Sequence, residues 1–138
     1  MKKILVTGAT GKIGLQTIEH LIKKGVPTSQ IIGLARSEEK AQALSALGIE
    51  VRLGDYFDYD SLVRAFEGVE KVMLTSAVSF TDRFKQHFNA ITAAREAGVQ
   101  HIVFMSIMRK AGSARRIEPD ITTSDIFTEQ LLKASGLK

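Results

Sequence analysis

Three evenly spaced glycines are the first feature of this chain that could do chemistry. They form the motif Gly8-x-x-Gly11-x-x-Gly14, directly after a short apolar run and at the start of an amphipathic stretch. In a strand-to-helix turn, the first glycine permits the tight turn and the second lets backbone N–H groups approach a pyrophosphate. The third lets the helix pack closely on the strand, and the dipole at the helix N-terminus favours an anion. The motif therefore favours dinucleotide binding; a purely structural turn is the alternative.

The end of the second apolar run distinguishes between the two nicotinamide dinucleotides. A carboxylate there binds the adenosine 2′-hydroxyl of NAD, whereas an arginine accepts the 2′-phosphate of NADP. Here Ala35 is followed by Arg36-Ser37, and the first carboxylate is Glu38. Arg36 can offer a two-pronged hydrogen bond to phosphate, and Lys12 in the glycine loop can add positive charge. We predict NADP(H) in preference to NAD(H); otherwise Arg36 only begins a solvated loop.

Small or polar residues also follow the later apolar runs. Asp55 could accept a hydrogen bond from the adenine amino group while Tyr56 lines the ring, or Asp55 could cap the next helix. Small side chains after the fourth run leave room for a ribose and a nicotinamide. The residues that follow the third, fourth and fifth runs are Gly54-Asp55-Tyr56, Thr75-Ser76-Ala77 and Ser106, respectively.

No acid, base or metal ligand can be assigned from the sequence. His20, His87 and His101 are too scattered for a metal site and have no carboxylate at ligand spacing. Ser106 has no neighbouring base, so we interpret it as a rim or structural residue, and Met105 as a core residue. The catalytic residues are therefore unknown, and no metal is expected.

The elements that must position these residues alternate regularly along the chain. Short apolar runs predict strands at residues 4–7, 30–35, 50–53, 71–75 and 101–105. Helical spacing and glycine stops predict helices at 12–24, 38–47, 60–66, 81–97 and 122–134. Strands that are apolar at successive positions are typical of parallel sheets covered on both faces. We predict a doubly wound α/β fold whose five-stranded parallel sheet has the order 3-2-1-4-5.

Length and composition fit one domain over residues 1–138. The chain is 44% hydrophobic and 25% charged, which suffices for a core without covalent staples. The absence of cysteine excludes disulfides, thiolate metal sites and a thiol nucleophile, and fits a cytoplasmic location. No apolar run approaches the length of a membrane span, so no membrane partner is expected.

The positive charge of the chain is concentrated in one segment. Residues 109–116 hold four basic and no acidic side chains, so the net charge of +4 comes from this segment alone. We interpret it as a solvated loop. A phosphate or nucleic-acid contact is the alternative, and nucleic-acid binding is not expected.

Together these motifs resemble the atypical short-chain dehydrogenases, and within them the NmrA-like branch that includes NAD(P)H:quinone oxidoreductases. The resemblance rests on Thr-Gly-Ala-Thr-Gly-Lys-Ile-Gly at 7–14, Leu-Ala-Arg at 34–36, Gly-Asp-Tyr at 54–56 and the stretches 93–106 and 127–137. It implies a Rossmann fold and places the cofactor loop at Gly8, Thr10, Gly11, Lys12 and Ile13. It further implies a 2′-phosphate position at Arg36, an adenine-side pair at Asp55 and Tyr56, and a ribose-side turn at Thr75, Ser76 and Ala77.

Two departures qualify what the resemblance implies. Short-chain dehydrogenases generally use a Tyr-x-x-x-Lys pair, but Tyr56 and Tyr59 are followed four residues later by Asp60 and Val63. The NmrA-like branch generally lacks the pair too. Family members also continue into a C-terminal lobe that closes over the substrate, so we expect a chain without that lobe, either a truncated product or a minimal natural variant.

The resemblance implies an NADP(H)-binding oxidoreductase domain that transfers hydride to a quinone or carbonyl acceptor. The alternative is a non-catalytic NAD(P)(H) sensor or interaction module. A chain that stops after the fifth strand exposes a sheet edge, so we also predict a homodimer or larger assembly through that edge.

Overall fold

One parallel sheet forms the centre of the molecule. The computed structural model describes residues 2–78, 81–108 and 119–138. Its strands are β1 (Lys3–Val6), β2 (Ile31–Ala35), β3 (Glu50–Leu53), β4 (Val69–Leu74) and β5 (His101–Phe104). They lie in the order β3-β2-β1-β4-β5, and every neighbouring pair is parallel. The predicted fold class and strand order are confirmed.

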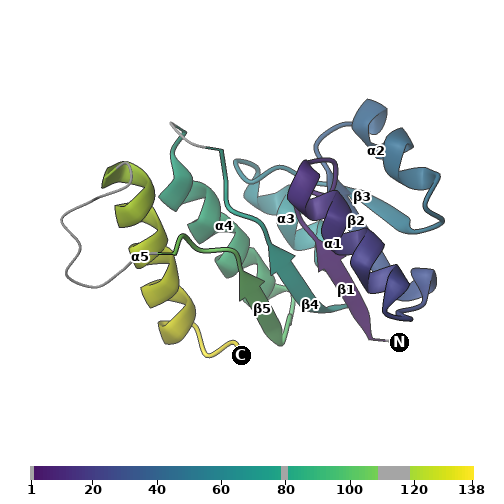
Figure 1. Cartoon of the computed structure of the whole chain (residues 1–138). Helices are drawn as coiled ribbons and strands as arrows, with labels where there is room; N and C mark the ends of the chain where they lie inside the picture. The colour runs from purple at the N-terminus through teal and green to yellow at the C-terminus, as the bar shows by residue number, and fades with distance from the viewer. Residues whose placement is uncertain (1, 79–80, 109–118) are drawn as a thin grey trace.

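The helices cover the sheet in two layers (Figure 1). They are α1 (Lys12–Lys23), α2 (Glu38–Ser45), α3 (Tyr59–Ala65), α4 (Arg83–Glu96) and α5 (Pro119–Ala134). A 3-10 turn at Thr28–Gln30, which the sequence did not indicate, leads into β2. Helix α5 begins three residues earlier than predicted, at a proline; proline fits the first helical turn because it lacks an N–H. None of the described helices is long and apolar enough to cross a membrane.

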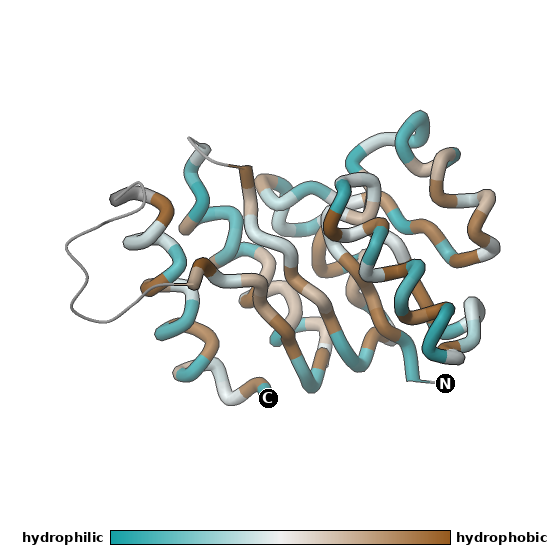
Figure 2. The backbone as a smooth tube through the Cα atoms, viewed as in Figure 1, coloured by the Kyte–Doolittle hydropathy of each residue, from teal (hydrophilic) through white to brown (hydrophobic). Residues whose placement is uncertain are grey.

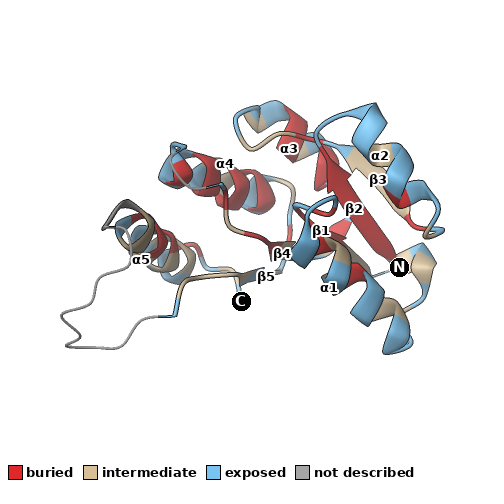
Figure 3. Cartoon of the chain, turned by 45° about the horizontal axis from the view of Figure 1, so that its top comes forward, coloured by how far each residue is buried: buried red, intermediate tan, exposed pale blue. Residues whose placement is uncertain are grey.

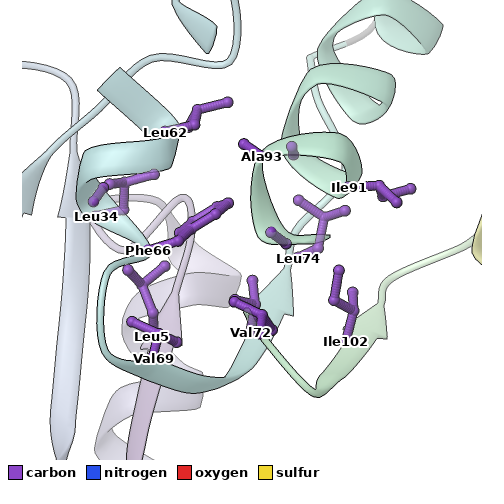
Figure 4. Packing of buried hydrophobic residues seen from close by; sticks show 14 of the residues in the cluster. Leu5, Leu34, Leu62, Phe66, Val69, Val72, Leu74, Ile91, Ala93 and Ile102 are labelled. Atoms are coloured by element: carbon purple, nitrogen blue, oxygen red, sulfur yellow. The ribbon is translucent and has the colours of Figure 1, made fainter. Parts of the chain in front are cut away.

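Alternate residues of the strands pack into two separate hydrophobic clusters. Leu5 and Ile32 pack with α3 and α4, whereas the neighbouring Val6 and Ile31 pack with α1 and α2. Figure 4 shows the first cluster, with Phe66 among side chains from the sheet and from α4. In Figure 2 the central strands are mostly hydrophobic, while the outer faces of the helices are largely hydrophilic. The prediction that helices cover both faces is thus confirmed for the central strands.

The cover is incomplete at β5. Ile102 is buried under α4, but Val103, which points to the other face, is 51% exposed. Helices α1 and α2 lie over β1 and β2 and do not extend over β5 (Figure 3). Three successive apolar residues in β5 therefore predicted more burial than the structure gives.

Of the helices whose N-termini are described, three begin with a side-chain cap. Ser37 accepts a hydrogen bond from the backbone N–H of Lys40, and Asp58 and Asp82 cap α3 and α4 in the same way. Helix α3 is therefore capped by Asp58 and not by Asp55. Helix α1 differs, because its N-cap is Gly11 and no side chain accepts from its first turn.

Candidate functional site

The glycine loop joins β1 to α1 and leaves the start of the helix open. Gly8 has a φ of +59°, and its carbonyl accepts a hydrogen bond from the N–H of Gly11 (2.9 Å). A Cβ on Gly8 would overlap Thr75 Oγ1, and a Cβ on Gly14 would overlap the backbone of Gly8 and Ala9. The loop therefore requires glycine at both positions. Because Gly11 carries no side chain, the first N–H groups of α1 are available to an anion.

Hydrogen bonds between β1, β4 and Tyr56 fix the point where the strand order reverses. Thr7 Oγ1 accepts from the backbone N–H of Thr75 (2.9 Å) and from the Tyr56 hydroxyl (2.6 Å). Thr75 Oγ1 donates to the Thr7 carbonyl at 3.1 Å. Burial raises the pKa of Tyr56, so its hydroxyl keeps its proton at neutral pH. Tyr56 thus ties the two strands together; that its ring also lines an adenine stays a prediction.

Positive side chains gather near the end of β2. Arg36 is exposed between β2 and α2, Lys40 is exposed in the first turn of α2, and Lys12 is exposed in the first turn of α1. Lys40 was not predicted. The signal in the sequence was its place four residues after Arg36, in the first turn that follows the N-cap Ser37.

Asp55 lies at the end of the strand next to β2. Its Oδ1 accepts a hydrogen bond from the backbone N–H of Phe57 (2.8 Å), so it stabilises its own turn and does not cap α3. The backbone N–H of Asp55 in turn donates to Ser61 Oγ at 3.0 Å. That Asp55 contacts an adenine stays a prediction.

A cavity of about 740 Å³ brings these residues together at the carboxyl ends of the strands. Every residue predicted to bind cofactor lines it: Gly8, Thr10, Gly11, Lys12, Ile13, Arg36, Asp55, Tyr56, Thr75, Ser76 and Ala77. Residues that the sequence did not assign to the site also line it, among them Leu34, Lys40, Ala43, Gln86 and Met105. Met105, interpreted as a core residue, therefore lies at the site.

Other candidate residues have different roles. The Ser106 hydroxyl donates to Glu129 Oε1 on α5. The Tyr59 hydroxyl bonds to the carboxylate of Glu96 on α4. Within the described part of the chain, neither tyrosine hydroxyl bonds to a lysine. In the described ranges, no three histidine, aspartate or glutamate side chains could hold a metal ion together. The basic segment 109–116 lies outside the described residues.

Comparison with known proteins places this geometry in a family. The model of the NmrA-like family matches residues 1–131. The chain belongs to the NmrA-like family. The resemblance found in the motifs is therefore confirmed.

Relatives of this NmrA-like chain include enzymes that reduce quinones and dyes. Quinone oxidoreductase 2 of Escherichia coli (strain K12) is 42% identical over 134 residues, which are 97% of this chain and 45% of that protein. The structure of an NADPH-dependent quinone oxidoreductase from Escherichia coli in complex with NADPH has a TM-score of 0.86 at 42% identity, covering 97% of this chain and 46% of that one. Triphenylmethane reductase from Citrobacter sp. has a TM-score of 0.87 at 39% identity, covering 98% and 46%. The NmrA-like chain spans just under half the length of these relatives.

Proposed function

We propose that the cavity binds NADP(H) and that the chain is the cofactor-binding part of an oxidoreductase. One observation carries the proposal: the same cavity is lined by an open helix N-terminus and by a cluster of basic side chains. The first suits a pyrophosphate, and Arg36 with Lys40 suits a phosphate ester on the neighbouring ribose. The relatives known to use NADPH support the same cofactor.

The dinucleotide would cross the sheet from β2 to β4. Arg36, Lys40 and Lys12 would hold the 2′-phosphate, and the loop from Gly8 to Ile13 the pyrophosphate. Beyond β1, the small residues Thr75 to Ala77 would accommodate the second ribose and the nicotinamide. The residues fit the cofactor, because Gly11 places no side chain over the first N–H groups of α1 and basic side chains line the same cavity.

When bound, NADPH would supply the hydride. The residues that line the cavity would bind the cofactor, orient it and exclude water from one side of it. We infer a quinone or carbonyl compound as the acceptor, in keeping with the names of the relatives. Tyr56 does not act as a proton donor in this proposal, because burial raises its pKa and its hydroxyl is bonded to Thr7 and to the carbonyl of Thr75. We also infer a cytoplasmic location, consistent with a chain that has no cysteine.

Cofactor fluorescence tests the proposal directly. Titration with NADPH should saturate well below millimolar concentration, and addition of a soluble quinone should oxidise the bound NADPH. No saturable binding up to millimolar NADPH would overturn the proposal. Saturable binding without oxidation by any quinone would instead favour the sensor or interaction module.

We further propose that copies of the chain associate through the β5 edge. The start of this edge is occupied within the chain, because Lys138 accepts from the N–H of Ile102 (2.9 Å) and donates to the carbonyl of Gln100 (3.1 Å). The exposed Val103 lies beyond this contact. Light scattering at tens of micromolar should give at least the mass of a dimer, and a monomeric mass would contradict the proposal.

A further inference from the structure

Buried polar side chains lie between α4 and α5, outside the set that would contact the cofactor. On α4 these are Arg83 and His87, which are 6% and 0% exposed. On α5 they are Ser124, Asp125 and Thr128, at 8%, 1% and 0%. Charged and titratable groups are seldom buried so completely unless they have specific partners. Their partners show what the cluster holds in place.

The α4 side chains bind both backbone groups of one residue, Ala77. His87 Nε2 accepts a hydrogen bond from the Ala77 N–H at 2.9 Å. Arg83 Nη1 donates to the Ala77 carbonyl. Ala77 follows β4 in an irregular segment, so these bonds replace those that a regular element would provide.

The hydrogen bond from Ala77 determines the state of the His87 ring. Since Nε2 accepts, the proton lies on Nδ1, which donates to Thr128 Oγ1 at 2.9 Å. The Thr128 hydroxyl donates onward to the carbonyl of Ser124 at 2.7 Å. Burial, with the charge of Arg83, lowers the pKa of His87 to about 4. The ring is therefore neutral near pH 7 and keeps its acceptor.

Arg83 is itself fixed by α5. Its Nη2 lies 2.8 Å from Asp125 Oδ1, and its Nε donates to Ser124 Oγ at 3.1 Å. The second oxygen of Asp125 accepts from the backbone N–H of Ile107 at 3.0 Å. The cluster thus connects the segment after β4 with the segment after β5.

Ala77 lies at the opposite end of the cavity from Arg36. It follows β4, whereas Arg36 follows β2, and β1 with the glycine loop lies between these strands. A dinucleotide whose 2′-phosphate is at Arg36 must place its nicotinamide half beside Ala77.

We propose that Arg83 and His87 are positioning residues for the nicotinamide half of the cofactor. They hold the backbone of Ala77 against that half without touching it, and Asp125 and Thr128 keep the two side chains in place. The inference rests on the proposed binding of NADP(H). It adds that the α4–α5 contact sets affinity for the nicotinamide half, independently of the adenosine half.

Two ligands and two variants of His87 distinguish binding of the nicotinamide half of the cofactor from binding of its adenosine half. Adenosine 2′,5′-bisphosphate carries the 2′-phosphate but has no nicotinamide. His87→Gln keeps an acceptor near the place of Nε2, whereas His87→Asn does not reach Ala77. By calorimetry, we expect His87→Asn to weaken NADPH about tenfold, as the loss of one buried hydrogen bond would, and to change adenosine 2′,5′-bisphosphate less than twofold. His87→Gln should recover most of the NADPH affinity.

A control on the same helix excludes a general loss of packing. Ile91→Val trims a residue that is 1% exposed and packs in the hydrophobic cluster of α3 and α4, so neither ligand should change. Equal losses for both ligands in His87→Asn, or no loss for either, would overturn the inference. Wild-type protein that binds neither ligand would overturn the proposed function, and the inference with it.

Hydrogen exchange provides a readout without ligand. The Ala77 amide should be protected in the wild type and in His87→Gln, and should exchange at least tenfold faster in His87→Asn. If His87→Asn does not fold, Thr128→Val serves instead, because it leaves the ring in place but removes the partner of Nδ1. An unprotected Ala77 amide in the wild type would contradict the structural basis of the inference.

Discussion

Single glycines determine whether the cofactor loop can form. Gly14 is in the first turn of α1, where a Cβ would overlap the backbone of Gly8 and Ala9. Backbone atoms cannot move aside as a flexible side chain can, so even one methyl group must displace the helix from the loop.

Gly14→Ala should therefore lower both NADPH affinity and stability. We expect NADPH binding to weaken more than tenfold and the free energy of unfolding to fall by about 2 kcal/mol, typical of an overpacked site. Calorimetry and urea unfolding measure the two effects. The control is Gly25→Ala, which has a φ of +89° but open space around its Cβ position. It should cost about 1 kcal/mol of backbone strain and leave NADPH affinity unchanged.

Arg36 provides the test of cofactor preference. Arg36→Ala should weaken NADPH binding about 10- to 100-fold, the usual effect of removing a charged hydrogen-bond donor. NADH, which has no 2′-phosphate, should change less than twofold. Arg95→Ala, an exposed arginine at the end of α4, should affect neither cofactor. Equal losses for NADPH and NADH would remove Arg36 from the phosphate role.

At the scale of elements, the buried ion pair between Arg83 and Asp125 joins α4 to α5. Its side chains are 6% and 2% exposed, whereas those of the pair Lys3–Glu50 are 26% and 38% exposed. Both pairs are close, but only the buried pair would leave an uncompensated charge inside the protein if one partner were lost.

Asp125→Asn should accordingly destabilise the protein strongly. We expect the free energy of unfolding to fall by about 3–5 kcal/mol, because the guanidinium of Arg83 would stay buried without its counter-charge. Glu50→Gln removes the acid of the more exposed pair and should cost less than about 1 kcal/mol. Chemical unfolding of both variants measures the difference. Similar small losses in the two variants would show that the buried pair is not needed to hold α5.

For the whole molecule, the buried neutral His87 makes stability depend on pH. Its pKa is about 4 in the folded protein and near 6.5 when the chain is unfolded. Between these values the unfolded chain binds a proton that the folded protein does not. The contribution of His87 is therefore complete above about pH 6.5 and decreases as the pH falls towards 4.

We expect this single group to lower the free energy of unfolding by about 3 kcal/mol between pH 7 and pH 4. His87→Gln does not titrate, so its unfolding free energy should depend less on pH over the same window, although carboxylates still contribute near pH 4. Urea unfolding at several pH values measures both profiles. Parallel profiles for the wild type and His87→Gln would mean that His87 titrates normally in the folded state.

Local patterns in the sequence were sufficient for the fold and for most of the cavity. The glycine motif, Arg36 and the small residues after β4 all follow strands, and parallel strands bring their carboxyl ends to one edge of a sheet. Residues on helices were harder to place, because spacing gives the face of a helix but not what that face meets. Gln86 on α4 lines the cavity and carried no signal of this kind. Met105 directly follows β5, but its apolar side chain suggested the core.

The sequence by itself determined a doubly wound sheet, its strand order and a loop suited to a pyrophosphate, because these depend on residue spacing and local backbone geometry. Only the tertiary structure decided that α5 fixes the Arg83 and His87 side chains that bind Ala77, and that the face of β5 at Val103 is uncovered. Those outcomes depend on contacts between residues about 40 positions apart and on how far neighbouring helices extend, which no local pattern encodes.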